Sequence, residues 1–429
     1  MLEEKKVNVL SNLMKDILTD EKEHRNISYV FVDPEEIQFL FQSLKNSDDM
    51  ENNLKKLLFI VSHQTISVNH ECMLTLLYIL NPDNGLSDII HGITLKLILE
   101  LITFKNNNIA AFFALPDSLQ IISSYFPLLD SAKIVVNIMN QIPSSIDNVL
   151  HIFSNLTNLK FPLNPNYMAT YMYFYPKLFK VMNQWSPIIE DFIEMLNNVI
   201  INSDDENLIY DSKSALKKIV KKYKNAAELL QDKYPLYCNF DPTESLENVD
   251  TIKILSAAAA SLNNYSFIAN EKILNYLHLC LTTNFDDGDD LLLFFTLDFF
   301  LQSKDYSGLY EYDFLYKDLV QLVNHGKYKI QVKIIEIICR FLMVNNIQIL
   351  NSYLKLFQVE ILLDFLEDES NTELQISILE CLVSIKSVLH SMNSNYIDEL
   401  INNNNNYDII ENIAYQRNDN LSSLAKLLL

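Results

Sequence analysis

The chain has 429 residues, of which 55 are acidic and 33 basic, and its formal net charge is −22. Hydrophobic residues make up 49% of the chain, which excludes wholesale disorder because a large core can form. Only 5 residues are Gly and 11 are Pro, which disfavours Gly-rich phosphate loops, dinucleotide-binding fingerprints and tight β-hairpins. The composition therefore favours an all-helical protein, built as about two to four domains or as one elongated repeat array.

The acidic balance bears on the kind of partner. Binding to a DNA or RNA backbone needs a basic face, so we expect no nucleic-acid partner. A basic protein or peptide partner fits the charge, and long-range attraction would speed its encounter with the chain. Plain solubility is the alternative explanation of the same charge.

Cysteine usage and apolar segments indicate the compartment. The cysteines form no CxxC pair and are odd in number, which fits reduced, buried thiols. They are Cys72, Cys238, Cys280, Cys339 and Cys381. Residues 1–6 lack the apolar core of a signal peptide, and the longest apolar stretches are too short to span a bilayer. We therefore expect a soluble cytoplasmic or nuclear protein without a membrane partner.

The first predicted pair of elements, at residues 40–62, recurs near the end of the chain. Its sequence, LFQSLKNSDDMENNLKKLLFIVS, aligns without a gap with LLDFLEDESNTELQISILECLVS at residues 362–384. Each copy predicts one helix, a short polar turn and a second helix, because Ser, Asp and Asn in the turn can cap the helix that follows. The matched apolar positions in the second helix are expected to be buried: Leu57, Ile60, Leu379 and Leu382.

A third copy precedes the second by one unit. Residues 330–338, IQVKIIEII, match residues 374–382, LQISILECL, and Glu336 recurs there as Glu380. Apolar residues spaced three and four apart indicate amphipathic helices, and we expect a helical content above about 60%. Further apolar segments are spaced by roughly 40 residues, the period of armadillo and HEAT units, which leaves room for about nine or ten units. These segments are residues 95–104, 134–142, 216–220, 252–262 and 291–301.

The repeated pattern resembles an armadillo repeat. An apolar helix, a polar turn and an LQxxILECLxxI helix follow one another at residues 359–385. The segment VLHIFSNLTNL at residues 149–159 resembles the third helix of such a unit, with Ser154 and Asn155 as its SN pair. Most units lack the Gly that usually separates the first two armadillo helices, so a HEAT-like array remains the alternative. The resemblance implies an all-α fold, a right-handed superhelical solenoid of armadillo- or HEAT-like repeats.

The same resemblance sets the expected organisation. We expect residues 1–429 to form a single continuous array with a concave surface lined by inner helices. An irregular break is expected near residues 160–187, where prolines precede an aromatic segment. The Asn-rich run at residues 402–406 is expected to be a flexible insertion without a function of its own.

Armadillo-like repeats imply protein or peptide binding without catalysis. The importin-alpha class of this family binds basic nuclear-localisation peptides with a ladder of Trp and Asn spaced four residues apart. Here the single Trp, Trp185, is followed at that spacing by Ile189, so the ladder is absent. We expect a non-enzymatic scaffold or adaptor that holds a basic protein or peptide on its concave face. The alternatives are a nuclear transport adaptor of importin-alpha type and a static structural subunit of a larger complex.

Five residues are the candidate contacts to the partner: Asn155, Asn158, Trp185, Glu336 and Glu380. Asn155 comes first because it stands where the armadillo pattern places its groove-lining Asn. An Asn amide can donate to and accept from an extended peptide at once. A role in capping or spanning a turn is the alternative for Asn155.

No segment predicts an enzyme, a cofactor, a metal site or a small-molecule substrate. The His-Glu-Cys run at residues 70–72 lacks the further cysteines of a zinc site. The acidic run at residues 286–290 lacks EF-hand spacing, and it fits the N-terminus of a helix that starts near Leu291. No phosphate loop, nucleophile elbow or metalloprotease motif occurs.

Two further segments have two interpretations each. The basic segment at residues 213–224, KSALKKIVKKYK, predicts either the solvated face of an amphipathic helix or a patch for an acidic partner. The buried stripe of that helix would be Leu216, Ile219, Val220 and Tyr223. The aromatic segment at residues 167–179, YMATYMYFYPKLF, predicts either inter-repeat packing or a partner contact.

Overall fold

A computed structural model describes the chain in eight stretches. It is 78% helical, which confirms the expected helical content, and no strand occurs in those stretches. The chain divides into two compact units, residues 1–212 and 213–429, and the division lies within helix α12 (Glu206–Lys222). The described stretches are residues 32–45, 49–103, 107–155, 165–240, 245–283, 290–323, 327–367 and 371–429.

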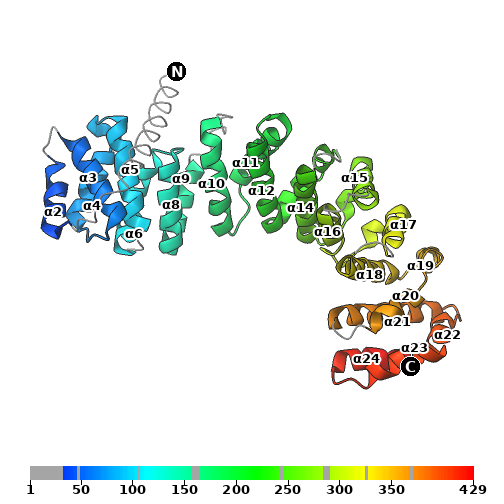
Figure 1. The fold of residues 1–429 in the computed structure, drawn as a ribbon. Helices are drawn as coiled ribbons and strands as arrows, with labels where there is room; N and C mark the ends of the chain where they lie inside the picture. The colour runs from blue at the N-terminus through cyan, green and yellow to red at the C-terminus, as the bar shows by residue number, and fades with distance from the viewer. Residues whose placement is uncertain are drawn as a thin grey trace. The chain divides into compact units, whose positions relative to one another are not determined.

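The first unit is a stack of helix pairs in two layers. The second helices of successive pairs, α3, α5, α8 and α10, pack side by side in one layer, and α2, α4, α7 and α9 form the other (Figure 1). The helices are α2 (Pro34–Ser43), α3 (Met50–His63), α4 (His70–Leu80), α5 (Asp88–Thr103), α6 (Asn107–Phe113), α7 (Pro116–Ser123), α8 (Leu129–Gln141), α9 (Ile146–Asn155), α10 (Pro165–Val181) and α11 (Pro187–Asn202).

The second unit repeats this plan. Its second helices, α14, α16, α18, α21 and α24, pack in succession, and we call them the second-helix row. Its helices are α13 (Lys224–Leu230), α14 (Ser245–Leu262), α15 (Glu271–Thr282), α16 (Asp290–Phe300), α17 (Asp313–Leu322), α18 (Tyr328–Leu342), α19 (Ile347–Leu354), α20 (Glu360–Leu366), α21 (Thr372–His390), α22 (Tyr396–Ile401), α23 (Asn404–Ala414) and α24 (Asp419–Leu428).

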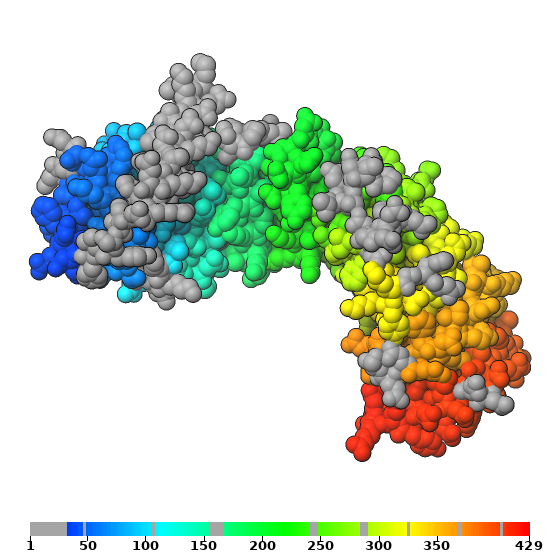
Figure 2. Space-filling model, in the orientation of Figure 1, coloured from blue at the N-terminus to red at the C-terminus, as the bar shows by residue number. Residues whose placement is uncertain are grey.

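Stacking of this kind defines an α solenoid. One helix pair cannot bury its apolar face alone, so each pair packs on its neighbours and the core runs along the stack. The space-filling view shows neighbouring pairs in close contact within each unit (Figure 2). Short 3₁₀ helices lie in the connections at Pro82–Asn84, Pro143–Ser145, Tyr234–Leu236, Ser266–Ile268 and Ser307–Leu309.

The internal repeat is confirmed at the level of secondary structure and burial. Residues 40–62 fall in α2 and α3, and residues 362–384 fall in α20 and α21. Leu57 and Leu379 are both fully buried, as is Leu382, and Ile60 is 8% exposed. The turns at 46–48 and 368–370 lie outside the described residues.

The individual repeats within these two units differ in their number of helices. Three helices make up α6–α8, α19–α21 and α22–α24, whereas α2–α3, α4–α5, α15–α16 and α17–α18 have two. The Asn-rich run that we predict to be an insertion spans the end of α22 and the first turn of α23. There the Asn406 side chain donates to the Leu400 carbonyl at 2.8 Å.

Helix α9 corrects one expectation from the armadillo resemblance. Residues 149–159 resemble the third, inner helix of an armadillo unit, but α9 packs beside α7 in the layer of first helices. The adjacent helices α8 and α10 contact each other in the other layer. Asn155 is the last residue of α9, so it does not lie on a second helix.

The aromatic segment at residues 167–179 is helix α10, and most of its rings form core. Tyr171, Phe174, Tyr175 and Phe179 are at most 5% exposed. They pack against aromatic rings from α9, α11 and the turn before α8, which are Phe126, Phe153 and Phe192. The structure therefore decides for inter-repeat packing at these positions.

Candidate partner-binding sites

The first unit contains an open cleft of about 730 Å³ where α10 ends and α11 begins. Ligand pockets typically fall between about 300 and 1,000 Å³, so the cleft can accept several side chains of a bound segment. Most of its lining residues are apolar, but polar atoms make up about half of the exposed lining, with Asp147 and His151 among the polar groups. The lining residues are Pro143, Ile146, Asp147, Leu150, His151, Phe153, Leu178, Val181, Met182, Asn183, Gln184, Trp185, Ser186, Pro187 and Ile188.

Trp185 lies in the connection that forms one wall of this cleft. Pro187 occupies the first turn of α11, and the preceding Ser186 is extended, with φ −144° and ψ 148°, as expected for a residue before Pro. The indole Nε1–H of Trp185 donates to Glu190 Oε1 at 2.7 Å. Glu190 is in the first turn of α11, where the helix dipole favours an acid. The local backbone and this hydrogen bond together orient the half-buried ring.

The cleft combines an indole ring, whose edge is bonded to Glu190, with one carboxylate in its lining, that of Asp147. A Trp face attracts a Lys or Arg cation more strongly than the other aromatic rings do. Glu190 contacts the ring edge, and Asp147 lines the cleft from the first turn of α9. Ile189 is fully buried, so no second ladder residue faces outward four positions after the Trp. The arrangement suits a basic or amphipathic peptide segment.

The cleft is not the groove that the sequence predicts. Its walls are one face of α9, the ends of α10 and α11 and the connection between them, whereas the expected partner surface is a row of inner helices. The side chain of Asn155 and the whole of Asn158 lie outside the described residues. Sequence reasoning singled out Trp185 but missed Glu190 and Asp147, for which the only signal was an acid in the first turn of a helix.

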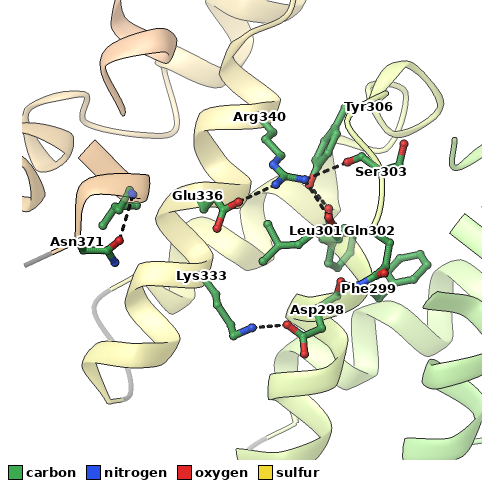
Figure 3. A network of polar contacts seen from close by, with 12 residues as sticks. Asp298, Phe299, Leu301, Gln302, Ser303, Tyr306, Lys333, Glu336, Arg340 and Asn371 are labelled. Atoms are coloured by element: carbon green, nitrogen blue, oxygen red, sulfur yellow. Dashed lines mark hydrogen bonds and ion pairs between the residues drawn. The ribbon is translucent and has the colours of Figure 1, made fainter. Parts of the chain in front are cut away.

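Glu336 and Glu380 lie on α18 and α21, neighbouring members of the second-helix row. Glu336 Oε1 accepts from Arg340 Nη2 at 2.6 Å, and Arg340 Nη1 also donates to the carbonyls of Leu301 and Ser303 at 3.0 and 3.1 Å (Figure 3). These bonds tie α18 to the turn after α16. Glu336 is therefore engaged in a structural network rather than presented to a partner.

Glu380 is exposed and has no hydrogen bond or ion pair to another described residue. The two glutamates thus occupy equivalent positions in their repeats but differ in their contacts. The structure brings them onto adjacent helices, but only Glu380 has a carboxylate that is available to a partner. The difference arises because Arg340 follows Glu336 by one helical turn, whereas Ser384 stands at the equivalent position after Glu380.

The remaining candidate segments have structural roles. At the start of α4, Asn69 caps the helix by accepting from the Cys72 N–H at 2.9 Å, and Glu71 pairs with Lys45 at 2.8 Å. His63 contacts the Phe59 carbonyl one turn earlier on its own helix. The part of the chain that the structure describes contains no group of metal-ligating side chains and no helix long and apolar enough to cross a bilayer.

The structure describes only part of the acidic run, and it confirms the buried stripe predicted for the basic segment. Residues 284–289 lie outside the described residues, and α16 begins at Asp290, close to the predicted start. In the basic segment the predicted stripe is confirmed, because its four residues are at most 8% exposed: Leu216, Ile219, Val220 and Tyr223.

All five cysteines are buried and free. Burial raises the pKa of Cys238 and of Cys280 to about 12, so both thiols stay protonated at neutral pH. A protonated, inaccessible thiol is a poor nucleophile and a poor metal ligand. The cysteines therefore act as small apolar core residues.

Comparison with known proteins supports the fold. The sequence matches no protein-family model, and no curated protein matches it. The crystal structure of an engineered protein from a structural genomics consortium is similar over 92% of this chain and 98% of that chain, with a TM-score of 0.60 and 11% sequence identity. At this identity the likeness shows a shared fold and no shared function.

Crystal structures of the karyopherin Kap121p match with lower scores. The complex with the SUMO protease Ulp1p has a TM-score of 0.40 and 16% identity, and the complex with Nup53p has 0.39 and 16%. Each match covers 93% of this chain but only 45% of the karyopherin. This chain thus spans less than half the length of Kap121p, and scores this low support no conclusion about its partners.

Proposed function

We propose that the protein is a non-enzymatic binding scaffold whose first unit holds a basic segment of a protein partner in the cleft around Trp185. The observation that carries the proposal is the indole held by Glu190 in a cleft that Asp147 also lines. A Lys or Arg of the partner would place its stem on the ring and its charge beside the carboxylates. The net charge of −22 would steer such a partner toward the chain.

The repeat type and the setting belong to the same proposal. The three-helix units α6–α8 and α19–α21 favour armadillo-type repeats within a mixed array. A scaffold of this kind would act in the cytoplasm or the nucleus, as the reduced cysteines suggest. The alternative is a static subunit of a larger complex. A stable complex that does not exchange its partner would indicate such a subunit, and rapid exchange of the partner would indicate a scaffold or adaptor.

Binding of a defined peptide to the full chain tests the proposal. The probe is a fluorescein-labelled peptide with alternating Lys and Leu in a Gly/Ser background, measured by anisotropy over a salt series. We expect saturable binding that weakens as salt rises, and a loss of about tenfold in affinity for Trp185→Ala, the effect of removing one good cation–aromatic contact and its packing.

A matched control separates the cleft from general stickiness. Tyr415→Ala removes another aromatic ring, 79% exposed, from the second unit and is expected to leave binding unchanged. Glu190→Gln keeps a hydrogen-bond acceptor for the indole but removes the charge, so it should weaken binding less than Trp185→Ala. Equal binding by wild type and Trp185→Ala would refute the cleft as the site.

A further inference from the structure

The two helical layers of the first unit differ in charge. The second helices α3, α5, α8 and α10 pack side by side in one layer, and α2, α4, α7 and α9 form the other (Figure 1). The first helices carry Asp and Glu but neither Lys nor Arg, so every lysine of these eight helices lies on a second helix. These lysines are Lys55, Lys56, Lys96, Lys133, Lys177 and Lys180.

The middle two second helices show that the lysines lie on the side that faces solvent. Helix α8 has neighbours on both sides in its layer and first helices beneath it, so one side stays open. That side is a stripe of Lys133, Asn137 and Asn140, with buried residues between them. The Asn137 side chain donates to Thr103 Oγ1 on α5 at 3.5 Å, which joins the open sides of the two helices. Lys96 lies two turns before Thr103 on the same side of α5.

The outer two second helices continue this side of the layer. Lys56 on α3 and Lys177 on α10 are both exposed. Each has an aromatic ring next to it: Phe59, three residues after Lys56, is 44% exposed, and the ring centroid of Tyr173 lies 3.3 Å from Lys177 Nζ. We call the surface that carries one lysine from each second helix the lysine face, which consists of Lys56, Lys96, Lys133 and Lys177.

Most cations of the lysine face have no carboxylate partner. Lys55, beside the face on α3, pairs with Glu51 of its own helix at 2.9 Å. No such ion pair with a residue in the described part of the chain is made by three members of the face, Lys56, Lys133 and Lys177. These three ammonium groups are therefore available to an anion from outside.

The acids near the middle of the face do not neutralise it. Asp130, one turn before Lys133 on α8, is only 8% exposed and lies beneath the face. Glu100, one turn after Lys96 on α5, is half-buried and adds a single negative charge. The face is thus a basic surface on a chain whose net charge is −22.

The spacing of the lysines indicates the kind of anion. Packed helices lie about 8–10 Å apart, and residues three positions apart in an extended peptide are separated by about 10 Å. A segment that crosses the second helices with Asp or Glu at about every third position would therefore meet a lysine on each helix. A nucleic-acid backbone carries a charge on every nucleotide, which one lysine per helix cannot match, and the net charge of −22 would repel it.

We propose that the lysine face is a docking surface for an extended acidic segment of a protein partner. Its carboxylates are received by Lys56, Lys133 and Lys177, and an apolar side chain of the segment packs on Phe59. The Trp185 cleft lies at helix ends and along α9, outside this face, and attracts the opposite charge. The lysine face therefore does not depend on the function proposed for the cleft.

Anisotropy with the full chain tests the lysine face. The probe is a fluorescein-labelled peptide with Glu at every third position and one Phe in a Gly/Ser background. We expect saturable binding that weakens as salt rises. Lys56→Gln, Lys133→Gln and Lys177→Gln should each weaken binding by about three- to fivefold, the effect of one partly exposed ion pair. The triple variant should weaken it by about thirtyfold or more, because contacts on separate helices add.

The controls separate the lysine face from folding, from general charge and from the cleft. Lys304→Gln removes an exposed lysine from the second unit and should leave affinity unchanged, and Trp185→Ala should do the same. Circular dichroism melts verify that the triple variant, which loses no ion pair with a described residue, stays folded. Binding by the triple variant equal to wild type would overturn the proposal. Tighter binding of a single-stranded oligonucleotide than of the peptide, weakened by the same substitutions, would overturn it in favour of nucleic acid.

Discussion

Arg340 and Glu336, one turn apart on α18, form an ion pair at 2.6 Å, and the same Arg340 side chain also binds the preceding repeat. The same guanidinium donates to the carbonyls of Leu301 and Ser303, which follow α16. Only 18% of the Arg340 side chain is exposed. Charge-assisted bonds in such a setting are among the stronger polar contacts in a protein.

We predict that Arg340→Ala lowers the free energy of unfolding of the second unit by about 2–4 kcal/mol, because two carbonyls and a carboxylate lose their donor. Arg340→Lys should recover part of this loss, since an ammonium cannot reach all three acceptors at once. Denaturant titration followed by circular dichroism measures both. Arg417→Ala, at an exposed site, is the control and should change stability by less than about 0.5 kcal/mol.

Leu379→Ala is predicted to cost about 2–5 kcal/mol, as for other fully buried leucines that leave a cavity. Coupling in a solenoid is largely between neighbours, so protection from hydrogen exchange should fall in α18, α21 and α24. Leu427→Ala removes a side chain that is 61% exposed and should have little effect. An equal loss of protection around Leu57 would contradict local coupling.

Asn371 and Asn395 provide a matched test of helix capping. The Asn371 side chain accepts from the Leu374 N–H at 3.1 Å, whereas Asn395, at the N-cap of α22, makes no such bond. Asn371→Ala should therefore cost about 0.5–2 kcal/mol, and Asn395→Ala should cost little. Thermal melts of the two variants give the comparison, and similar losses in both would argue against a specific cap at α21.

Asp130 should make stability fall as pH rises. Burial raises the pKa of this carboxyl, with Lys133 and Lys96 opposing the shift, so its ionised form is less favourable in the fold than in the unfolded chain. The contribution of Asp130 to stability is therefore fully present below its unfolded pKa of about 3.9, and it is lost as pH rises through its pKa in the folded state. Asp130→Asn should melt at a higher temperature than wild type at pH 7, with a difference that shrinks toward pH 4.

Asp398 is the control of opposite sign. Hydrogen bonds from His390 and then Lys386 lower the pKa of its carboxyl. The ionised form is therefore favoured in the fold, and its contribution is present above the unfolded pKa and is lost as pH falls. Asp398→Asn should lower the melting temperature at pH 7. If both Asn variants shifted it in the same direction, the difference in environment would not explain the effects.

Local sequence was sufficient to predict the helical units. Apolar residues three and four apart determine which face of a helix is buried, and Leu379 and Leu382 could be assigned to the core because Leu57 and Ile60 repeat the pattern. The cap at Asn371 follows from the polar turn before it. These features depend on residues within one or two helical turns, which is the range that a sequence pattern reports.

The layer to which a helix belongs required the structure. The pattern at residues 149–159 resembles an inner armadillo helix, yet α9 packs beside α7 among the first helices. An amphipathic stripe shows that a helix has a buried face but does not specify the neighbour that buries it. The helix that carries Asn155 therefore lies among the first helices, and the contact of Asn155 with a partner stays a prediction.

The candidate sites were decided by tertiary packing. Trp185 was visible in the sequence, but its bond to Glu190 forms across a break between two helices. Lys253 on α14 and Lys333 on α18 lie over the rings of Phe295 and Phe294 on α16, and neither lysine has a local pattern that marks it. Composition and periodicity determine that helices form and stack. The register of one helix against the next determines which side chains meet, because that register depends on the fit of both surfaces.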